Sequence, residues 1–448
     1  MRSLLLKNVK KIHMIGVGGV SMSGLASYLL FNDYCVSGSD VQINDQIENL
    51  KNKGLAFFQN HKPENIKDDV DLVVYSGAIK EDNEELIKAN QLKIKTMERS
   101  EFLGEVAGGF RNTLSVAGTH GKTTTTAYLS YIFMEAKSNP TISIGGNLIG
   151  LSNFITGGNE YFICEACEFR ESFKYLNSTY AIITNIEADH LDYYKTLSNV
   201  KLAFLNFANK VKNKVITYKN DYLKLKLPDK VINCGDNKKY EYSFEIELKN
   251  SSGASFKVYN FNKLIGIYKI RQFQDYNIIN AFLSVVLAKQ FEVSNEIICD
   301  ALLKFKGVER RNETIGMVSN VPIIADYAHH PTEIEQSLRS SKEIFDKVLC
   351  LFQPHTYSRT KSLLNEFKEC FRNADQLCFF KTYPARENYD KDGSEKTLFE
   401  ACLNKDKALF YDENELFSYL KKNVNKFDAV LVLGAGDLYD IMKKMLIK

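Results

Sequence analysis

Short apolar segments alternate with amphipathic ones over the first hundred residues of the chain. The apolar segments are KIHMIGV, YCVSGSD and DLVVYSGA, at residues 11–17, 34–40 and 71–78. Segments with the apolar spacing of helices follow them, at residues 20–31, 44–53 and 83–91. Alternation of strands with helices gives a parallel sheet with crossover helices. The pattern therefore predicts a Rossmann-like α/β domain at the start of the chain.

The same alternation returns twice further along. In the central region we predict a helix from Lys122 to about Ala136, a helix at 275–291, and strands at 113–118, 161–166, 180–186 and 213–218. The intervening residues 220–270 are polar and strand-like, with turns at NCGDN and NSSGAS. In the last region we predict strands at 321–328, 346–353, 375–380 and 427–436, and helices at 331–345, 363–371 and the chain's end. The fold class is therefore α/β with three domains, residues 1–108, 109–311 and 312–448, of which the central one is P-loop ATPase-like with a mainly parallel sheet and the last is Rossmann-like.

Composition excludes several classes of function. The chain has 448 residues, of which 44% are hydrophobic and 25% charged, and its net charge of +3 gives no reason to expect binding to nucleic acid or to an anionic membrane. No apolar stretch reaches the ~18 residues that a membrane span needs, so we expect a cytoplasmic protein. Nine dispersed cysteines indicate reduced thiols, and Cys164 and Cys167 form a CxxC without the second pair that a zinc site needs.

The glycine-rich turn at residues 118–123, GTHGKT, is the first candidate for chemistry. It lies between a predicted strand and a predicted helix, where backbone N–H groups, the helix dipole and a lysine can together hold phosphate. The strict phosphate-loop pattern needs a glycine where Val116 stands, so the loop is shortened. A glycine-rich turn before a threonine-capped helix is the structural alternative. We interpret the turn as a cradle for the phosphates of ATP.

An earlier glycine-rich turn, GVGGVS at residues 16–21, also joins a predicted strand to a predicted helix. In the dinucleotide-binding pattern GxGxxG, Ser21 stands where the third glycine is expected. Asp40 ends the next predicted strand, where an acidic residue can reach a ribose hydroxyl. The turn fits a nicotinamide dehydrogenase or a domain that holds the diphosphate of a nucleotide-linked substrate. Because the turn at residues 118–123 is interpreted as an ATP site and hydride transfer does not use ATP, we favour a nucleotide-linked substrate over a nicotinamide cofactor at residues 16–21.

Seven motifs together carry a family resemblance. They are GVGGVSMSGLA, GTHGKTTT, EACEFRESF, TNIEADHLDYY, DYAHHPTEI, FQPHTYSRT and LGAGD. In this order they resemble the Mur ligases of peptidoglycan synthesis, over nearly the whole chain. Within the family, the residues are most similar to the branch that attaches L-alanine, and EACEFRESF resembles the Gram-positive variant of it.

The resemblance implies a function for each domain. The first domain would bind the UDP moiety of UDP-N-acetylmuramic acid, the central domain ATP and Mg²⁺, and the third domain L-alanine. In the implied reaction, the γ-phosphate of ATP passes to the muramoyl carboxylate, and the amino group of L-alanine then attacks the acyl phosphate. Two alternatives stay open: a sister ligase that attaches a preformed muropeptide to the same UDP-sugar, and a protein that binds the UDP-sugar without catalysis.

The resemblance also implies the residues of the ATP and metal sites. The predicted ATP-binding residues are Gly118, Thr119, His120, Gly121, Lys122, Thr123, Thr124, Tyr276, Asn280, Arg310 and Asp326. The predicted metal ligands are Thr123, Glu165 and His190. Glu165 also closes a predicted strand, the end at which ligands gather in parallel sheets. A helix-capping or core histidine is the alternative for His190.

The remaining implied residues belong to the two substrates. The predicted UDP-sugar-binding residues are Gly18, Gly19, Val20, Ser21, Asp40, His61 and Ser76, and the predicted amino-acid-binding residues are His329, His355 and Arg359. Lys122, Glu165, His190 and His329 would be catalytic, and His330 would cap the helix that starts at Pro331. This chain departs from the family pattern at Ala325, which replaces the first of two aspartates, and lacks the phenylalanine expected after Arg311.

Overall fold

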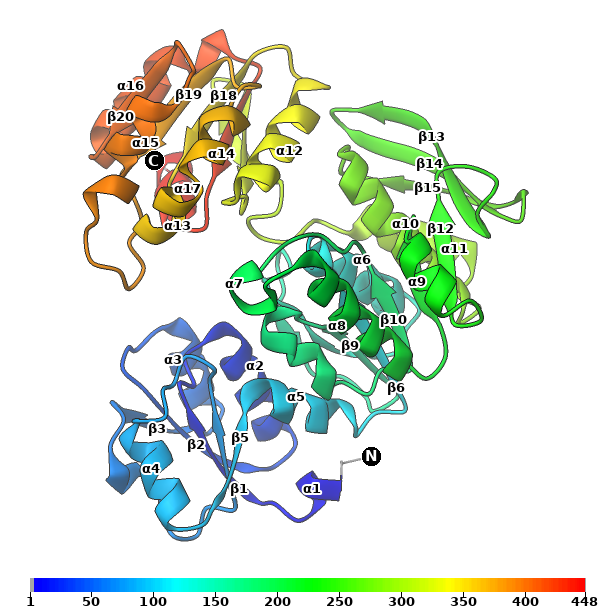
Figure 1. Cartoon of the computed structure of the whole chain (residues 1–448), viewed down its shortest axis with the longest axis vertical. Coiled ribbons are helices and arrows are strands. Elements are labelled where there is room, and N and C mark those ends of the chain that lie inside the picture. Colours follow the sequence, from blue (N-terminus) through cyan, green and yellow to red (C-terminus); the bar gives the residue numbers. More distant parts are fainter. Residues whose placement is uncertain (1–3, 448) are drawn as a thin grey trace. The chain divides into compact units, whose positions relative to one another are not determined.

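The computed structural model describes residues 4–447 and contains two compact units, Met1–Lys306 and Gly307–Lys448. The first unit holds two sheets and the second unit holds one (Figure 1). Each of the three predicted domains therefore contains one sheet, which confirms the three-domain α/β fold. The domain boundaries themselves stay predictions.

The first sheet has five parallel strands in the order β3-β2-β1-β4-β5. The strands are β1 (Lys11–Ile15), β2 (Cys35–Asp40), β3 (Ala56–Gln59), β4 (Leu72–Tyr75) and β5 (Lys95–Glu98). The helices of this region are α1 (Leu4–Lys7), α2 (Val20–Phe31), α3 (Asp45–Asn52), α4 (Glu84–Gln91) and α5 (Arg99–Ala107). The pattern missed β3, β5 and α5; β5 has a single apolar residue, Met97, and no residue of β3 is buried.

The second sheet has ten strands in the order β15-β14-β13-β12-β11-β10-β6-β9-β7-β8. The strands are β6 (Asn112–Ala117), β7 (Thr141–Ser143), β8 (Phe154–Ile155), β9 (Tyr161–Glu165), β10 (Tyr180–Ile183), β11 (Val215–Tyr218), β12 (Val231–Gly235), β13 (Tyr242–Asn250), β14 (Gly253–Asn260) and β15 (Lys263–Ile270). The main helices are α6 (Lys122–Glu135), α8 (Leu197–Lys210), α9 (Asp221–Lys226), α10 (Asp275–Lys289) and α11 (Asn295–Lys304). The polar stretch 220–270 contains α9 and β12 and ends in the antiparallel strands β13 to β15.

The first two sheets share one apolar core, which extends from Leu6 to Val231. At their junction, Gly24 of α2 lies against Phe154 of β8, and a Cβ atom on Gly24 would be 2.8 Å from the Phe154 side chain. Asn153 donates a side-chain hydrogen bond of 3.0 Å to the Val20 carbonyl at the start of α2. The glycine in the helix therefore allows the close packing of these two sheets.

The sheet of the second unit has six strands in the order β16-β17-β21-β18-β19-β20, and only β16 is antiparallel to its neighbour. The strands are β16 (Glu313–Val318), β17 (Val321–Asp326), β18 (Val348–Phe352), β19 (Gln376–Phe380), β20 (Lys407–Phe410) and β21 (Ala429–Leu433). The helices are α12 (Pro331–Lys342), α13 (Tyr357–Ser362), α14 (Leu364–Cys370), α15 (Glu395–Ala401), α16 (Glu413–Asn423) and α17 (Leu438–Ile447). Every residue of β18, β19 and β21 is buried, because apolar clusters cover both faces of the sheet.

Most predicted site residues follow the carboxyl ends of parallel strands. The first glycine turn follows β1, Asp40 ends β2, the second glycine turn follows β6, and Glu165 ends β9. Ligands of open α/β sheets bind at this edge. The nine cysteines are free thiols, and none of the described helices is long and apolar enough to cross a membrane.

Candidate active site

The second glycine turn is fixed by close approaches that only glycine permits. Gly118 and Gly121 have φ angles of +141° and +83°. A Cβ atom on Gly118 would be 1.9 Å from Thr184 Oγ1, and one on Gly121 would be 2.8 Å from Asn280 Oδ1. The glycines therefore serve both the turn conformation and its contact with neighbouring segments.

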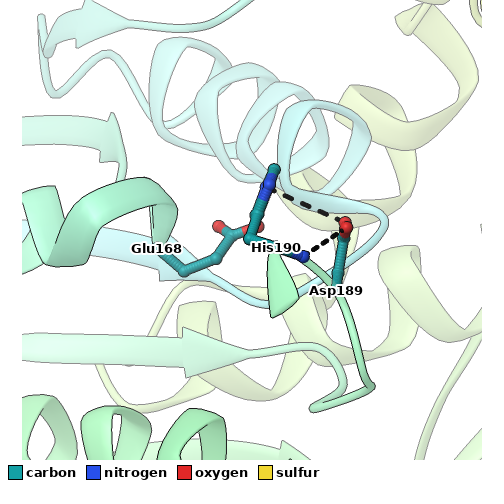
Figure 2. Close-up of side chains that lie close together, drawn as sticks. All are labelled: Glu168, Asp189 and His190. Atoms are coloured by element: carbon teal, nitrogen blue, oxygen red, sulfur yellow. Dashed lines mark hydrogen bonds and ion pairs between the residues drawn. The ribbon is translucent and has the colours of Figure 1, made fainter. Parts of the chain in front are cut away.

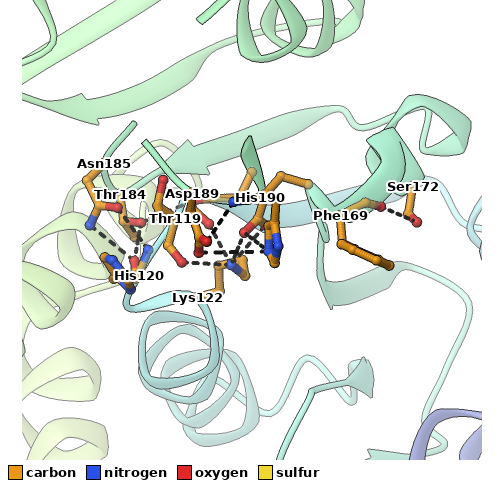
Figure 3. A network of polar contacts seen from close by, with 12 residues as sticks. Thr119, His120, Lys122, Phe169, Ser172, Thr184, Asn185, Asp189 and His190 are labelled. Carbon is orange, nitrogen blue, oxygen red and sulfur yellow. Dashed lines mark hydrogen bonds and ion pairs between the residues drawn. The ribbon is translucent and has the colours of Figure 1, made fainter. Parts of the chain in front are cut away.

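The segment that follows β10 holds this turn from the side (Figure 3). The backbone N–H of Thr119 donates to the Asn185 carbonyl at 3.2 Å, and that of His120 donates to the Asn185 side chain at 2.9 Å. The Thr184 hydroxyl donates to the His120 carbonyl at 2.6 Å, and Glu187 N–H donates to the Thr119 hydroxyl at 2.9 Å. The sequence predicted the turn, but it gave no sign that the TNIEAD motif holds it.

Lys122 begins α6 and points back into the turn. Its ammonium donates to the carbonyls of Gly118 at 2.6 Å and Thr119 at 3.0 Å, and to Glu168 Oε1 at 2.9 Å. Glu168 is only 4% exposed, and its Oε2 atom, which has no hydrogen bond in the described structure, lies 2.9 Å from the same ammonium. The charge of Lys122 therefore compensates the burial of this carboxylate.

His190 lies beside the same carboxylate (Figure 2). Its Nε2 atom is 3.8 Å from Glu168 Oε1 and 3.8 Å from Asp189 Oδ2. One side-chain ligand atom from each of Glu168, Asp189 and His190 lies within 4.8 Å of the other two. His190 has a left-handed backbone with a φ of +52° and precedes the short helix α7 (Leu191–Tyr194), while its ring meets the edge of Phe169 at a centroid distance of 5.0 Å.

The other two predicted metal ligands, Thr123 and Glu165, are not part of the cluster around His190. Thr123 is in the first turn of α6 and is 8% exposed. Glu165 Oε1 accepts the backbone N–H of Gly145 at 2.7 Å, and the described cluster around His190 contains Glu168 and Asp189 instead. Sequence reasoning missed Glu168 and Asp189, although one lies three residues after Glu165 in the same motif and the other precedes His190. The role of Glu165 stays a prediction.

These residues suit a divalent cation. Carboxylates are the protein ligands that Mg²⁺ prefers, and the carboxylates of Glu168 and Asp189 both lie beside His190. A histidine is an unusual partner for Mg²⁺, so Glu168 and Asp189 would supply most of its binding energy.

Two of the predicted ATP-binding residues, Tyr276 and Asn280, are on α10. Asn280 is 5% exposed and packs against Gly121 of the turn. Further along the helix, the Ser284 hydroxyl donates to the Thr125 carbonyl of α6 at 3.1 Å. Tyr276 is in the first turn of the same helix. The structure thus brings α10 next to the second glycine turn.

The first glycine turn is built differently. The Gly18 N–H donates to Asp40 Oδ2 at 2.9 Å, and Asn44 donates to the Gly18 carbonyl at 3.0 Å. Asp40 therefore fixes the turn through one of the N–H groups that we expected to face the diphosphate. Gly19 is the N-cap of α2 and no side chain caps this helix, so the N–H groups of its first turn, at Val20 and Ser21, are the better candidates for an anion.

The other predicted UDP-sugar residues lie at the same edge of the first sheet. His61 Nδ1 is 2.9 Å from the hydroxyl of Ser39, which precedes Asp40 in β2. Ser76 directly follows β4, and a Cβ atom on Gly16 of the turn would be 3.1 Å from its Cβ. These predicted residues therefore lie close to the first glycine turn.

In the second unit, the three predicted amino-acid-site residues come together. The His329 and His355 ring centroids are 6.1 Å apart, and an Arg359 guanidinium nitrogen is 3.2 Å from His355 Nδ1. His355 also stacks on Tyr383 with an interplanar angle of 20°. Burial, together with the charge of Arg359, lowers the pKa of His355 to about 4, and burial also lowers the pKa of His329.

The hydrogen bonds of these histidines assign their protons. Arg359 only donates, so His355 Nδ1 accepts and its proton is on Nε2. His329 Nδ1 is 2.9 Å from the Tyr327 carbonyl, which only accepts, so its proton is on Nδ1 and its Nε2 keeps a lone pair. His329 is thus the one of the two that can accept a proton from an amine.

Arg310 and Asp326 both make contacts within the second unit. Arg310 donates to the Gly436 carbonyl at 2.9 Å and to Asp440 at 2.8 Å, and its guanidinium lies 4.5 Å from the ring centre of Tyr439. Asp326 accepts the N–H groups of Asn312 and Ala328, and burial raises its pKa to about 6 despite the nearby charge of Arg311. Their predicted roles at ATP stay predictions.

The prediction that His330 caps a helix is confirmed. His330 is the N-cap of α12, its side chain accepts the N–H of Thr332, and Glu333 completes a capping box. Of the two adjacent histidines in the AHHP motif, one therefore has a structural role and the other faces His355.

Comparison with known proteins finds matches over almost the whole chain. Three sequence models match: "Mur ligase family, catalytic domain" over residues 11–111, "Mur ligase middle domain" over 116–288, and "Mur ligase, glutamate ligase domain" over 310–436. The UDP-N-acetylmuramate–L-alanine ligase of Clostridium tetani is 41% identical over 97% of both chains. That of Clostridium beijerinckii is 39% identical over 98% of this chain and 97% of the relative.

Solved structures give the same result. The crystal structure of UDP-N-acetylmuramate-alanine ligase from Thermotoga maritima superposes with a TM-score of 0.81 at 27% identity, covering 98% of both chains. A murein peptide ligase from Psychrobacter arcticus shares the fold, with a TM-score of 0.68 at 22% identity over 98% of both chains. With its two glycine turns, its lysine–carboxylate–histidine cluster and its matches over all three regions, the chain belongs to the Mur ligase family.

Proposed function

We propose that this protein uses ATP to join L-alanine to the carboxylate of UDP-N-acetylmuramic acid. The products would be UDP-N-acetylmuramoyl-L-alanine, ADP and phosphate. The reaction would work in the cytoplasm as a step in making peptidoglycan precursors. The relatives named above carry this activity in their names, and the proposal extends it to this chain.

The observation that carries the proposal is the meeting of Lys122, Glu168 and His190 at the carboxyl ends of β6, β9 and β10. Phosphoryl transfer to a carboxylate brings several anions together, so catalysis depends on positioning and on neutralising charge. The N–H groups of Thr119 and His120 already bond to Asn185. We therefore expect the phosphates at the first turn of α6, from Gly121 to Thr123, where no side chain caps the helix.

Lys122 must exchange partners for this to happen. In the structure its ammonium bonds to two carbonyls of its own turn and to Glu168. When ATP binds, we expect the ammonium to turn to the phosphates and leave Glu168 to a cation. Mg²⁺ held by Glu168, Asp189 and His190, with Thr123 as a further candidate ligand, would neutralise phosphate charge during transfer.

The amine step uses residues of the second unit. Arg359 offers a planar, two-pronged donor to the α-carboxylate of the incoming amino acid. His329 has a free Nε2 lone pair and a lowered pKa, so it stays neutral near pH 7 and can take a proton from the ammonium of alanine. Only the resulting free amine is a nucleophile toward the acyl phosphate.

Phosphate release tests the proposal directly. The protein is incubated with ATP, Mg²⁺ and UDP-N-acetylmuramic acid. Single amino acids and the tripeptide L-alanyl-γ-D-glutamyl-meso-diaminopimelate are then compared as the amine substrate. We expect release that needs both the UDP-sugar and L-alanine. Release with the tripeptide alone would instead identify the sister ligase that attaches a preformed muropeptide.

Two other outcomes would overturn the proposal. Equal phosphate release without the UDP-sugar would mean that the first glycine turn serves another ligand. Binding of the UDP-sugar with no release for any amine substrate would mean a binding protein without catalysis.

A further inference from the structure

A buried polar network is hydrogen-bonded to the first glycine turn, and its central residue has no role assigned above. Its centre is Glu85 of α4, whose side chain is fully buried. Glu85 Oε2 accepts the Ser39 hydroxyl at 2.5 Å and lies 3.3 Å from His61 Nδ1. Glu85 Oε1 accepts the Asn65 amide at 2.6 Å and lies 3.6 Å from His13 Nε2. A buried polar network destabilises the fold unless its polar atoms are hydrogen-bonded, so the geometry of the hydrogen bonds indicates where the hydrogens lie.

Glu85 is ionised in this network. Burial alone would raise its pKa, but the nearby His13 ring and the hydrogen-bond donors Ser39 and Asn65 outweigh burial and lower it. An ionised carboxylate only accepts hydrogen bonds. Ser39 must therefore donate its single hydroxyl proton to Glu85.

This fixes the proton on the neighbouring histidine. The Ser39 oxygen, having donated its proton, can only accept from His61 Nδ1 at 2.9 Å, and the other neighbour of Nδ1 is the carboxylate. Nδ1 therefore carries a hydrogen, and the neutral ring keeps its lone pair on Nε2. His61 Nε2 has no hydrogen-bond partner among the described residues, and the side chain is 16% exposed.

Ser39 also ties this histidine to the glycine turn. Its carbonyl accepts the N–H groups of Gly16 at 2.8 Å and Val17 at 3.0 Å. The residue after it, Asp40, holds Gly18. One residue of β2 thus bonds to the turn through its backbone and to His61 through its side chain.

We infer that Glu85 is a positioning residue which, through Ser39, keeps His61 Nε2 as a hydrogen-bond acceptor for an N–H or O–H group of the uridine in the UDP-sugar. The inference rests on the proposed function for the identity of that ligand. Glu85 itself need not touch the ligand.

The substitution Glu85→Gln reverses the chain of hydrogen bonds with almost no change of shape. Asn65 donates to Oε1, so the new carbonyl oxygen stays on that side and the new NH₂ group faces Ser39. Ser39 then accepts from Gln and donates to His61 Nδ1, which moves the ring proton to Nε2. The acceptor offered to the uridine becomes a donor.

Two measurements test this. Nitrogen-15 NMR of the histidine side chains, with His61→Gln to assign the signal, should show a proton on Nδ1 in the parent protein and on Nε2 in Glu85→Gln. Calorimetry with UDP should show about tenfold weaker binding to Glu85→Gln, as for one lost hydrogen bond in a buried site. The kcat at saturating substrates and the KM values for ATP and L-alanine should stay within about twofold.

Asn65→Ala is the matched control, because it removes a donor from the same carboxylate but leaves Ser39 and His61 in place. Its His61 proton should stay on Nδ1 and its UDP affinity within about twofold. Ser39→Ala provides a second test should Glu85→Gln fold poorly: it removes the link to Glu85 and should weaken UDP binding about threefold.

The outcomes separate the inference from the proposed function. Weaker UDP binding with the proton still on Nδ1 in Glu85→Gln would overturn the inference, since Glu85 would then act through packing. An unchanged UDP affinity despite proton movement would also overturn it. If the proton and the UDP affinity change as expected but the protein ligates no alanine, the inference stands and the proposed function fails.

Discussion

His190 and His355 have the same side chain in two regions with opposite surroundings. His190 faces the carboxylates of Glu168 and Asp189, whereas His355 accepts a hydrogen bond from Arg359. A histidine with acidic neighbours can bind a cation together with those carboxylates. Burial and a neighbouring cation instead disfavour the protonated form of a histidine, so its ring stays neutral. The neighbours of each histidine, more than the residue type, therefore favour a metal ligand at His190 and an uncharged ring at His355.

The largest effect should come from the lysine of the acidic region. Lys122→Ala should lower kcat about a hundredfold, because one preorganised charge contributes ~3 kcal/mol to the transition state. Phosphate release measures the rate, and calorimetry should find UDP-sugar affinity within about twofold of the parent protein.

The Lys122→Ala variant should also be less stable, because it removes the ammonium that pairs with the buried carboxylate of Glu168. The double variant Lys122→Ala/Glu168→Gln should regain melting temperature but not activity. A single variant that keeps more than a third of the activity would show that the turn is only structural.

The next effect tests the cationic region. Arg359→Lys keeps the charge but loses the planar two-pronged geometry, so the KM for L-alanine should rise about thirtyfold, or ~2 kcal/mol. The affinity for UDP-N-acetylmuramic acid, measured without ATP, should change less than twofold. A collapse of that affinity with an unchanged KM for alanine would move Arg359 to the sugar-nucleotide site.

A smaller effect distinguishes two carboxylates of one motif. Glu168→Gln should raise the Mg²⁺ concentration for half-maximal rate about tenfold, because Glu168 is the buried carboxylate beside His190. Glu165→Gln is the matched variant and should raise it about twofold at most. His190→Ala should also raise the Mg²⁺ requirement, and an unchanged requirement with a lower melting temperature would make His190 a core histidine.

The smallest effect is a pH dependence in the cationic region. Burial and Arg359 lower the pKa of His355 from 6.5 to about 4, so the folded protein binds fewer protons than the unfolded chain between these values. This contribution to the free energy of unfolding is full above pH 6.5 and is lost as pH falls toward 4. It should be below ~2 kcal/mol, because the ring is partly solvated. Denaturant titrations at pH 7 and pH 4.5 should show a shallower pH slope for His355→Gln, and an unchanged slope would contradict the lowered pKa.

Much of the fold could be predicted, since the apolar pattern is local. Residues 122–136 and 275–291 were expected as helices and form α6 and α10. The pattern does not reveal β5, because only one of its four residues, Met97, is apolar, or β3, which has no buried residue and is placed in the sheet by its pairing with β2.

Local residue patterns indicate most of the element types, both glycine turns and the family resemblance, because these depend on residues close in the chain. The partner of Lys122 depends on tertiary structure. The rule that ligands gather at strand ends predicts Glu165 as a metal ligand, which stays a prediction, but it gives no sign that Glu168, three residues further along, pairs with the lysine. Likewise, Asp40 reaches Gly18 and Glu85 reaches Ser39 across 22 and 46 residues. Such pairings follow from how separate strands and helices pack, and no periodicity along the chain encodes them.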